Sequence, residues 1–156
     1  MSKILVIGYG NPLRGDDGLG WYVAQELERE AWNPHVEVLV RCQLTLELAE
    51  LISQKDLVIF VDAAAGDKPG KLTCNPVRAN TAAPDFFTHH VDLSLLLACA
   101  GQLYGKCPKA FTLSITGQSF AYDVGLSAPV LYALPELWEC LTALIDGVAE
   151  EEKACA

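Results

Sequence analysis

The sequence predicts a single-domain α/β fold, in which a mostly parallel, twisted sheet of about five strands has helices on both faces. Its 156 residues suit one domain, and 51% of them are apolar, which is enough for a hydrophobic core. Short apolar runs alternate with segments of helical periodicity, the pattern of parallel strands joined by helices. One run follows the preceding strand after a loop too short for a parallel crossover, so we expect one antiparallel strand.

Five apolar runs predict the strands. They lie at residues 3–7, 35–40, 57–61, 71–77 and 111–115. The run at 57–61 is almost wholly apolar, as expected for a central strand that is covered on both faces. The run at 71–77 is the antiparallel one, and we expect it at an edge of the sheet.

Apolar residues at helical spacing predict four helices between and after these runs. The helices begin near Gly18, Thr45, Leu93 and Ser127. Ser127 can cap the last helix, and Pro135 should bend that helix or divide it in two. We therefore assign residues 1–149 to one α/β domain and expect residues 150–156 to form a frayed, acidic tail.

Charge and composition exclude several classes of function. Eleven basic and 20 acidic residues give a formal net charge of −9, and such a surface repels nucleic acid. No apolar run nears the length of a membrane span, about 18 residues, and the N-terminus has no export signal. The six cysteines form no Cys-x-x-Cys pair, which excludes a zinc ribbon and a dithiol motif. We expect a cytoplasmic monomer that binds neither nucleic acid nor a membrane.

The first strand leads into a glycine-rich loop with the sequence GYGNPLRGDDGLG (8–20). A dinucleotide-binding loop presents backbone N–H groups and a positive helix start to a phosphate, whereas Asp16 and Asp17 would repel a phosphate there. A nucleotide-binding module is therefore disfavoured. One aspartate suffices to cap the helix, which leaves the other for a second role.

A further candidate, Asp62, ends the apolar strand in VIFVDAAAG, where open α/β sheets bind their ligands. The first and third strands should be neighbours, so Asp17 and Asp62 can converge. His89 and His90 lie on a loop before the leucine-rich helix, over the same edge of the sheet. Two carboxylates and one imidazole would form a three-ligand site for a divalent metal such as nickel or zinc. Either aspartate could instead be a capping or turn residue.

Three segments together resemble the nickel-iron hydrogenase maturation endopeptidases, namely GYGNPLRGDDGLG, VIFVDAAAG and THHVDLSLLLA. The resemblance extends from Lys3 to about Ile145. It implies an endopeptidase that removes the C-terminal extension from the precursor of the hydrogenase large subunit after nickel has been inserted. It also implies that the nickel is supplied in the substrate, so we expect no tightly held metal in the resting enzyme.

The resemblance also assigns the site. By motif, the family's two metal-contacting acids fall on Asp17 and Asp62 and its histidine falls on His89, so these three are the expected catalytic and metal-binding residues. His89 fits the family's spacing to the following leucines better than His90 does. Many members have Glu where this chain has Asp17, which is shorter but keeps the charge. The metal could polarise the scissile carbonyl or activate water, and the resemblance does not decide between these two mechanisms.

The loop after the second strand departs most from the family. Arg41 and Gln43 lie at the carboxyl edge of the sheet, where we expect them to contact the precursor unless the loop is an ordinary turn. Its continuation, QLTLEL, is similar to the subgroup that serves bidirectional, NAD(P)-linked hydrogenases. An alternative function for the same residues is a non-catalytic, nickel-sensing chaperone or checkpoint for the same precursor.

Overall fold

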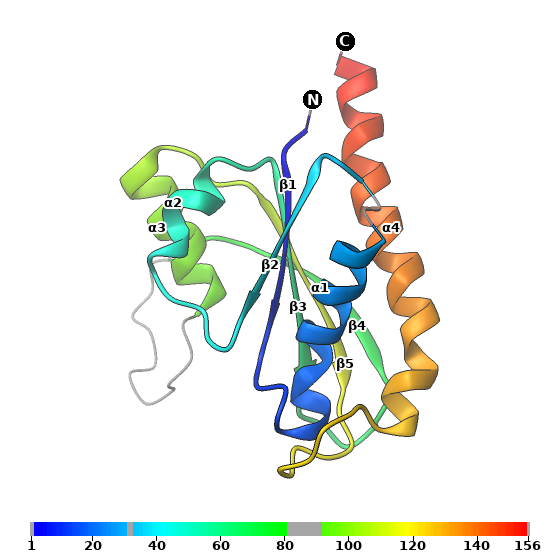
Figure 1. Ribbon diagram of the computed structural model, residues 1–156. Coiled ribbons are helices and arrows are strands. Elements are labelled where there is room, and N and C mark those ends of the chain that lie inside the picture. Colours follow the sequence, from blue (N-terminus) through cyan, green and yellow to red (C-terminus); the bar gives the residue numbers. More distant parts are fainter. Residues whose placement is uncertain (1, 31–32, 81–91, 156) are drawn as a thin grey trace.

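The computed structural model describes residues 2–30, 33–80 and 92–155, which form one five-stranded sheet with helices on both faces (Figure 1). The strands are β1 (Ile4–Tyr9), β2 (Val36–Arg41), β3 (Leu57–Ala64), β4 (Leu72–Val77) and β5 (Lys109–Thr116). Their order in the sheet is β2-β1-β3-β5-β4. All neighbouring pairs are parallel except β4 and β5, so β4 is an antiparallel edge strand. The predicted fold class and the place of the antiparallel strand are confirmed.

Helices cover both faces of this sheet. They are α1 (Leu19–Arg29), α2 (Leu48–Ser53), α3 (Leu93–Tyr104) and α4 (Ala128–Cys155), and a 3-10 turn, η1 (Gly15–Gly18), precedes α1. The helices α1 and α4 pack on one face, and α2 and α3 pack on the other (Figure 1). Because β1 lies between β2 and β3, the loops that follow these three parallel strands meet at the same edge of the sheet.

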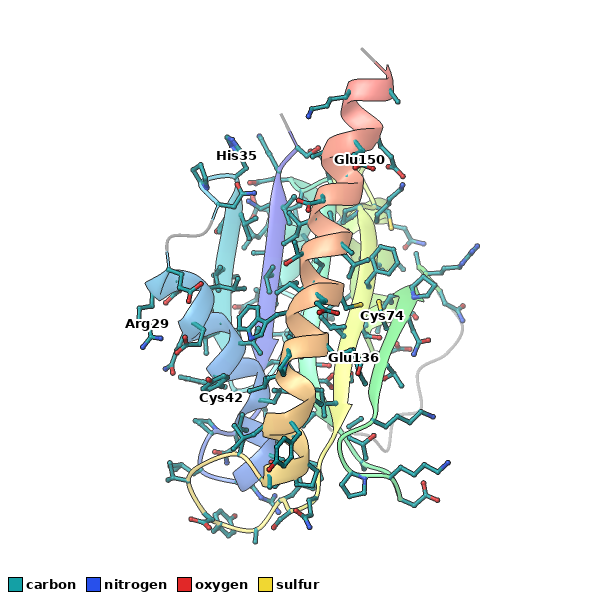
Figure 2. All side chains as sticks on the ribbon, turned by 90° about the vertical axis from the view of Figure 1, so that its right-hand side faces the viewer. Arg29, His35, Cys42, Cys74, Glu136 and Glu150 are labelled. Carbon is teal, nitrogen blue, oxygen red and sulfur yellow. The ribbon has the colours of Figure 1, made fainter. Side chains whose placement is uncertain are left out.

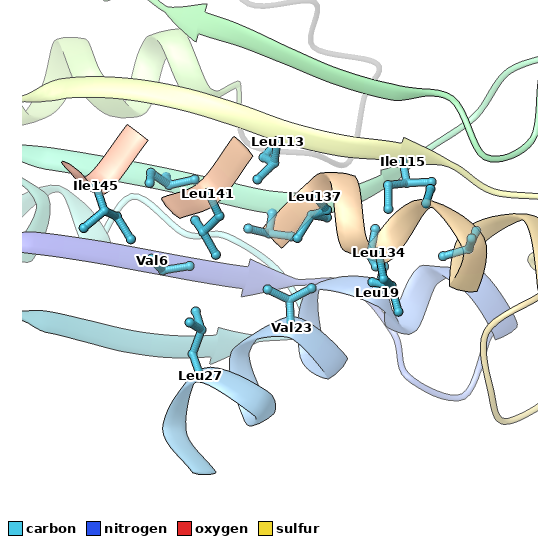
Figure 3. Packing of buried hydrophobic residues seen from close by; sticks show 14 of the residues in the cluster. Val6, Leu19, Val23, Leu27, Leu113, Ile115, Leu134, Leu137, Leu141 and Ile145 are labelled. Carbon is cyan, nitrogen blue, oxygen red and sulfur yellow. The ribbon is translucent and has the colours of Figure 1, made fainter. Parts of the chain in front are cut away.

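Alternating side chains of the strands build two separate hydrophobic cores. On β1, Ile4 and Val6 face α1 and α4, whereas Leu5 and Ile7 face α2 and α3. Figure 3 shows the first core, in which leucines of α1 and α4 pack over the sheet. Residues 57–61 of β3 are completely buried because helices cover both of their faces. Each such apolar side chain contributes roughly 1.5–3 kcal/mol to stability by leaving water.

Two glycines let the start of α1 pack directly on β1. A Cβ on Gly8 would lie 2.0 Å from the carbonyl oxygen of Gly20, and a Cβ on Gly20 would lie 2.5 Å from the backbone nitrogen of Tyr9. Neither position can carry a side chain unless the backbone moves. These glycines of the 8–20 segment therefore serve the packing of a helix on a strand, which also holds the loop between them at the edge of the sheet.

The last helix bears on two expectations from the sequence. α4 passes through Pro135 as one continuous helix, so Pro135 does not divide it. The helix also continues to Cys155, over residues that we expected to form a frayed tail. The Nζ atom of Lys109, on β5, lies 2.6 Å from Oε2 of Glu151 and ties this end of α4 to the sheet. By length and composition alone, residues 128–151 of α4 could also span a membrane, but their apolar side packs in the first core.

Candidate functional site

A pocket of about 420 Å³ lies at the carboxyl ends of β1, β2 and β3. Its polar side chains include Tyr9, Asp17, Gln43 and Asp62. Cys42 also lines the pocket, and it lies at the opposite end of β2 from His35 (Figure 2). Segments that are far apart in the sequence thus meet at one edge of the sheet, as the predicted strand order requires.

Asp62 occupies one rung of the sheet together with polar residues of both neighbouring strands. In the register of β3 and β5, Asp62 is paired with Ser114, and the Ser114 hydroxyl donates a hydrogen bond to Asp62 Oδ1 at 2.5 Å. From the other side, the hydroxyl of Tyr9, the last residue of β1, donates to Asp62 Oδ2 at 2.9 Å. Each oxygen of this half-buried carboxylate therefore accepts a hydroxyl from a different strand.

The Tyr9 hydroxyl is a donor in this contact because its proton is held firmly. Burial raises the pKa of Tyr9, and the negative charge of Asp62, its hydrogen bond and the charge of Asp17 raise this pKa further. Both carboxylates line the same pocket as the phenol. Asp62 is thus supplied with a permanent hydrogen-bond donor.

Asp17 is directed to the pocket by a tight loop. Its Oδ2 atom accepts the backbone N–H of Asn11 at 2.7 Å. The chain folds back at Gly10, whose φ of 137° is rarely adopted by other residues, and a Cβ there would lie 2.2 Å from the carbonyl oxygen of Asp17. The glycine of the motif therefore allows the close approach that places Asp17 beside the end of β1.

The neighbouring aspartate, Asp16, has a different task. It is 1% exposed, and its carboxylate accepts hydrogen bonds from the backbone nitrogens of Ser127 (2.7 Å), Gln118 (2.7 Å) and Ser119 (3.1 Å) and from the Ser127 hydroxyl (2.7 Å). Burial alone would raise the pKa of Asp16, but these hydrogen bonds outweigh it and lower the pKa below its usual value. Asp16 thus has a structural role, and Asp17 is the aspartate of the pair that lines the pocket.

The same contact corrects the expected role of Ser127. Its carbonyl oxygen accepts the backbone N–H of Leu131 at 3.0 Å, so Ser127 does stand at the start of α4. Its hydroxyl, however, donates to Asp16 instead of capping the helix. The hydroxyl proton goes to Asp16 because a charged carboxylate is a strong hydrogen-bond acceptor.

The structure separates the two residues that we expected to contact the precursor. Gln43 lines the pocket together with Asp17 and Asp62. Arg41 is exposed and not part of that lining, and its Nη1 atom donates to the carbonyl oxygen of Val40 at 2.8 Å. Of the pair, only Gln43 is placed to meet a substrate in the pocket.

The predicted histidine ligand, His89, and its alternative, His90, lie outside the described residues. The helix that follows them, α3, is capped by Asp92, whose Oδ1 atom accepts the N–H of Ser94 at 2.9 Å. Within residues 2–30, 33–80 and 92–155, no group of three or more His, Cys, Asp and Glu side chains is placed to hold a metal ion. The two pocket aspartates therefore need a further ligand from the protein or the substrate to complete a metal site.

Sequence reasoning missed Tyr9 and Ser114, although each carries a signal. Tyr9 follows Ile7 in the alternation of β1, which places it on the face of the sheet that α2 and α3 cover. Ser114 is a polar residue between two buried apolar ones on β5, and it is itself buried. A polar group in such a place needs a partner, and Asp62 lies on the same rung.

The chain is similar in sequence to known proteins. No family model matches the chain. The Hydrogenase 2 maturation protease of Escherichia coli is 30% identical in an alignment that covers 95% of this chain and 94% of that protein. The hydrogenase expression/formation protein HupD of Bradyrhizobium diazoefficiens is 31% identical in an alignment that covers 72% of this chain and 60% of HupD.

Solved structures show the same fold. The hydrogenase maturating endopeptidase HybD of Escherichia coli superposes with a TM-score of 0.71 at 24% identity, over 93% of each chain. The [NiFe] hydrogenase maturation protease HycI of Thermococcus kodakarensis superposes with a TM-score of 0.72 at 22% identity, also over 93% of each chain. The sheet and helices described above are therefore those of this group of structures.

The separate roles of the two adjacent aspartates can be tested by stability. We expect Asp16→Asn to lower the free energy of unfolding by about 3 kcal/mol near neutral pH, because hydrogen bonds to a charged group are lost and an amide N–H faces other donors. Asp17→Asn, which has one backbone donor to satisfy, should cost less than about 1 kcal/mol. Denaturant unfolding of both variants and the wild-type protein measures the difference.

The pH dependence of the Asp16 effect has a defined sign. Because folding lowers the pKa of Asp16, its charged form stabilises the protein above the ordinary aspartate pKa, and this contribution is lost as the pH falls through the lower, folded pKa. The gap between the wild-type protein and Asp16→Asn should therefore narrow in acid. Equal losses for Asp16→Asn and Asp17→Asn, or a gap that does not change with pH, would contradict this assignment.

Proposed function

The chain belongs to the hydrogenase maturation proteases, and from this premise we propose that it is an endopeptidase that removes the C-terminal extension of a nickel-iron hydrogenase large-subunit precursor after nickel insertion. The family resemblance of the sequence is confirmed by the relatives, whereas the subgroup for bidirectional hydrogenases stays a prediction. One observation carries the proposal: Asp17 and Asp62, which come from two separate motifs, line the same pocket at the carboxyl edge of the sheet.

The pocket suits a divalent cation that arrives with the substrate. Asp17 and Asp62 offer carboxylate oxygens, and we propose His89 as the third ligand, because imidazole suits nickel. In this proposal the nickel belongs to the precursor, and the resting enzyme holds no metal tightly. Nickel would act there as a Lewis acid, toward either the scissile carbonyl or a water molecule.

The charges of the pocket support binding of a metal-loaded precursor. Two carboxylates in one pocket repel each other unless hydrogen-bond donors or a cation offset their charge. In the free protein, donors from Tyr9, Ser114 and Asn11 partly do so. These neutral donors leave the net charge unchanged, so a divalent cation still binds favourably. A nickel-loaded precursor would therefore bind more tightly than a nickel-free one.

A nickel-sensing chaperone would use the same side chains without cleaving the precursor. Both functions require contact with the nickel, but only the protease shortens its partner. The similarity to a protein named as a maturation protease, over nearly the whole chain, favours the protease.

Mass spectrometry of the precursor separates these functions. The purified protein is incubated with nickel-loaded and with nickel-free precursor, and the masses of the products are compared. We expect the nickel-loaded precursor to be shortened at one bond and the nickel-free precursor to keep its mass. If neither is shortened, the protease proposal fails and the chaperone is favoured. If both are shortened, the nickel requirement is wrong.

The same assay tests the two pocket aspartates. Asp17→Asn and Asp62→Asn should each slow cleavage by at least about 100-fold, because an amide is a poor ligand for the cation. Asn is preferred to Ala because it keeps an acceptor for the donors that surround each carboxylate. The exposed residue Asp146, on α4, provides the control variant Asp146→Asn, which should cleave at the wild-type rate.

Thermal melting of the same variants shows whether slower cleavage comes from the loss of a metal ligand or from a less stable fold. The melting temperatures of Asp17→Asn and Asp62→Asn should stay within about 5 °C of the wild-type value. If either variant cleaves at the wild-type rate, the substituted aspartate is not a catalytic residue. A much larger loss of melting temperature would show that the carboxylate serves the fold, as a turn or capping residue would.

A second pair of variants decides between the two histidines. His89→Ala should abolish cleavage and weaken binding of nickel or cadmium to the protein, whereas His90→Ala should spare much of both. Adjacent side chains point in different directions in both helical and extended chains, so both imidazoles do not easily reach one cation. Calorimetric titration of each variant measures the affinity, and the opposite ranking would assign the ligand to His90.

The loop after β2 is expected to act on substrate choice. Gln43→Ala should lower the rate of cleavage of the cognate precursor by about 2-fold to 10-fold, the effect of one lost hydrogen bond, without weakening metal binding. Arg41→Ala is the matched comparison, since Arg41 lies in the same loop but outside the pocket lining. Rates for a cognate and a non-cognate precursor are measured side by side. Unchanged rates for Gln43→Ala would show that the loop is only a turn.

A further inference from the structure

The carboxylate of Asp62 is held from both sides, and that of Asp17 is not. Asp62 accepts the Tyr9 hydroxyl on one oxygen and the Ser114 hydroxyl on the other. Asp17 accepts the backbone N–H of Asn11 on Oδ2. The two aspartates of the pocket thus differ in how firmly each is fixed.

We propose that Tyr9 and Ser114 are positioning residues, which hold the Asp62 carboxylate in one orientation toward the pocket so that it meets the cation of the substrate without reordering. This inference rests on the proposed function, because it assigns to Asp62 a cation to meet. It adds that Asp62 is the fixed ligand of the pair and that Asp17 adapts to the incoming substrate.

The strand register explains why the two hydroxyls act together. Asp62 and Ser114 are register partners on β3 and β5, and Val61 is paired with Gly8, so the next rung brings Tyr9 of β1 beside Asp62. Paired residues of parallel strands project from the same face of a sheet. Three adjacent strands of a rigid sheet therefore supply the carboxylate and both of its donors.

The placement of the hydroxyls has no equally good explanation in packing. Ser114 is 8% exposed and stands between the buried apolar residues Leu113 and Ile115. Among the described residues, Asp62 is the hydrogen-bond partner of both side-chain hydroxyls. For packing alone, Ala at 114 and Phe at 9 would fill the same space without a polar group to satisfy.

Two donors on opposite oxygens restrict the carboxylate in a way that one donor cannot. A carboxylate bonded on one oxygen still turns about its Cβ–Cγ bond, whereas bonds to both oxygens oppose that rotation. Each oxygen also keeps further lone-pair capacity for a cation. A carboxylate that is held in its productive orientation keeps the cation correctly placed during the reaction, and groups that hold metal ligands in this way typically affect affinity or activity by about 10-fold to 100-fold.

Kinetics of conservative variants test the proposal in the full-length protein. Tyr9→Phe and Ser114→Ala each remove one hydroxyl. We expect each variant to lower kcat for the nickel-loaded precursor by about 10-fold, and the double variant by up to about 100-fold, with KM changed by less than about 2-fold. Thr112→Val is the control on β5, because the Thr112 hydroxyl bonds to the carbonyl oxygen of Asn75 and not to Asp62. Its kcat should equal that of the wild-type protein.

A thermodynamic cycle provides a readout that does not depend on catalysis. Tyr9→Phe should lower the melting temperature in the wild-type background but not in an Asp62→Ala background, where the Tyr9 hydroxyl has lost its acceptor. An equal loss in both backgrounds would show that the hydroxyl does not act through Asp62 and would overturn the proposal.

The kinetic outcomes separate this inference from the function on which it rests. If Asp62→Asn is inactive but Tyr9→Phe and Ser114→Ala keep the wild-type kcat, the positioning proposal is wrong and the proposed function stands. If Asp62→Asn itself cleaves at the wild-type rate, the proposed role of Asp62 as a metal ligand is wrong, and the positioning proposal is wrong with it. If Thr112→Val loses as much activity as Ser114→Ala, the effect belongs to the strand and not to the contact with Asp62, and the proposal is again wrong.

Discussion

The buried carboxylate of Asp16 joins segments of the chain that lie 102 to 111 residues apart. It accepts hydrogen bonds from Gln118 and Ser119, in the loop after β5, and from Ser127 at the start of α4. The loop approaches so closely that a Cβ on Gly117 would lie 3.0 Å from Asp16 Cβ. Together with backbone hydrogen bonds such as that from Gly15 to the carbonyl oxygen of Asp123, this ionised group holds η1, the loop after β5 and the first turn of α4 relative to one another.

The pocket depends on the hydrogen bonds of Asp16, although Asp16 does not line the pocket. Once the η1 turn is fixed, the next residue along the chain, Asp17, is directed toward the end of β1. The loop after β5 also supplies Phe120 to the lining of the same pocket. Asp62 is held independently, by donors on β1 and β5. A loop-borne carboxylate and a strand-borne carboxylate are thus brought together by two different networks of hydrogen bonds.

Local patterns in the sequence predict the fold and the placement of Asp17 and Asp62 at one edge of the sheet. They do not predict which of two nearby residues faces the pocket. The apolar run before Asp62 marks a central strand. Asp62 lies near the end of this strand and Asp17 follows the adjacent parallel strand. The neighbouring sequence does not show that Asp16 is buried and Asp17 faces the pocket, because the hydrogen bonds that bury Asp16 come from the distant loop after β5. The same holds for Arg41 and Gln43, which share a loop whose course brings only the second into the pocket. α4 continues through Pro135, at a cost of about 3 kcal/mol, because its long apolar side packs on the sheet.

The central claim is that Asp17 and Asp62 bind one divalent cation together. Anomalous X-ray diffraction from crystals of the wild-type protein soaked in cadmium tests it most directly, because the signal locates the ion without reference to activity. The account predicts one anomalous peak within bonding distance of a carboxylate oxygen of Asp17 and of Asp62. A peak that contacts only one of these carboxylates, or ions bound only elsewhere at saturating cadmium, would contradict it.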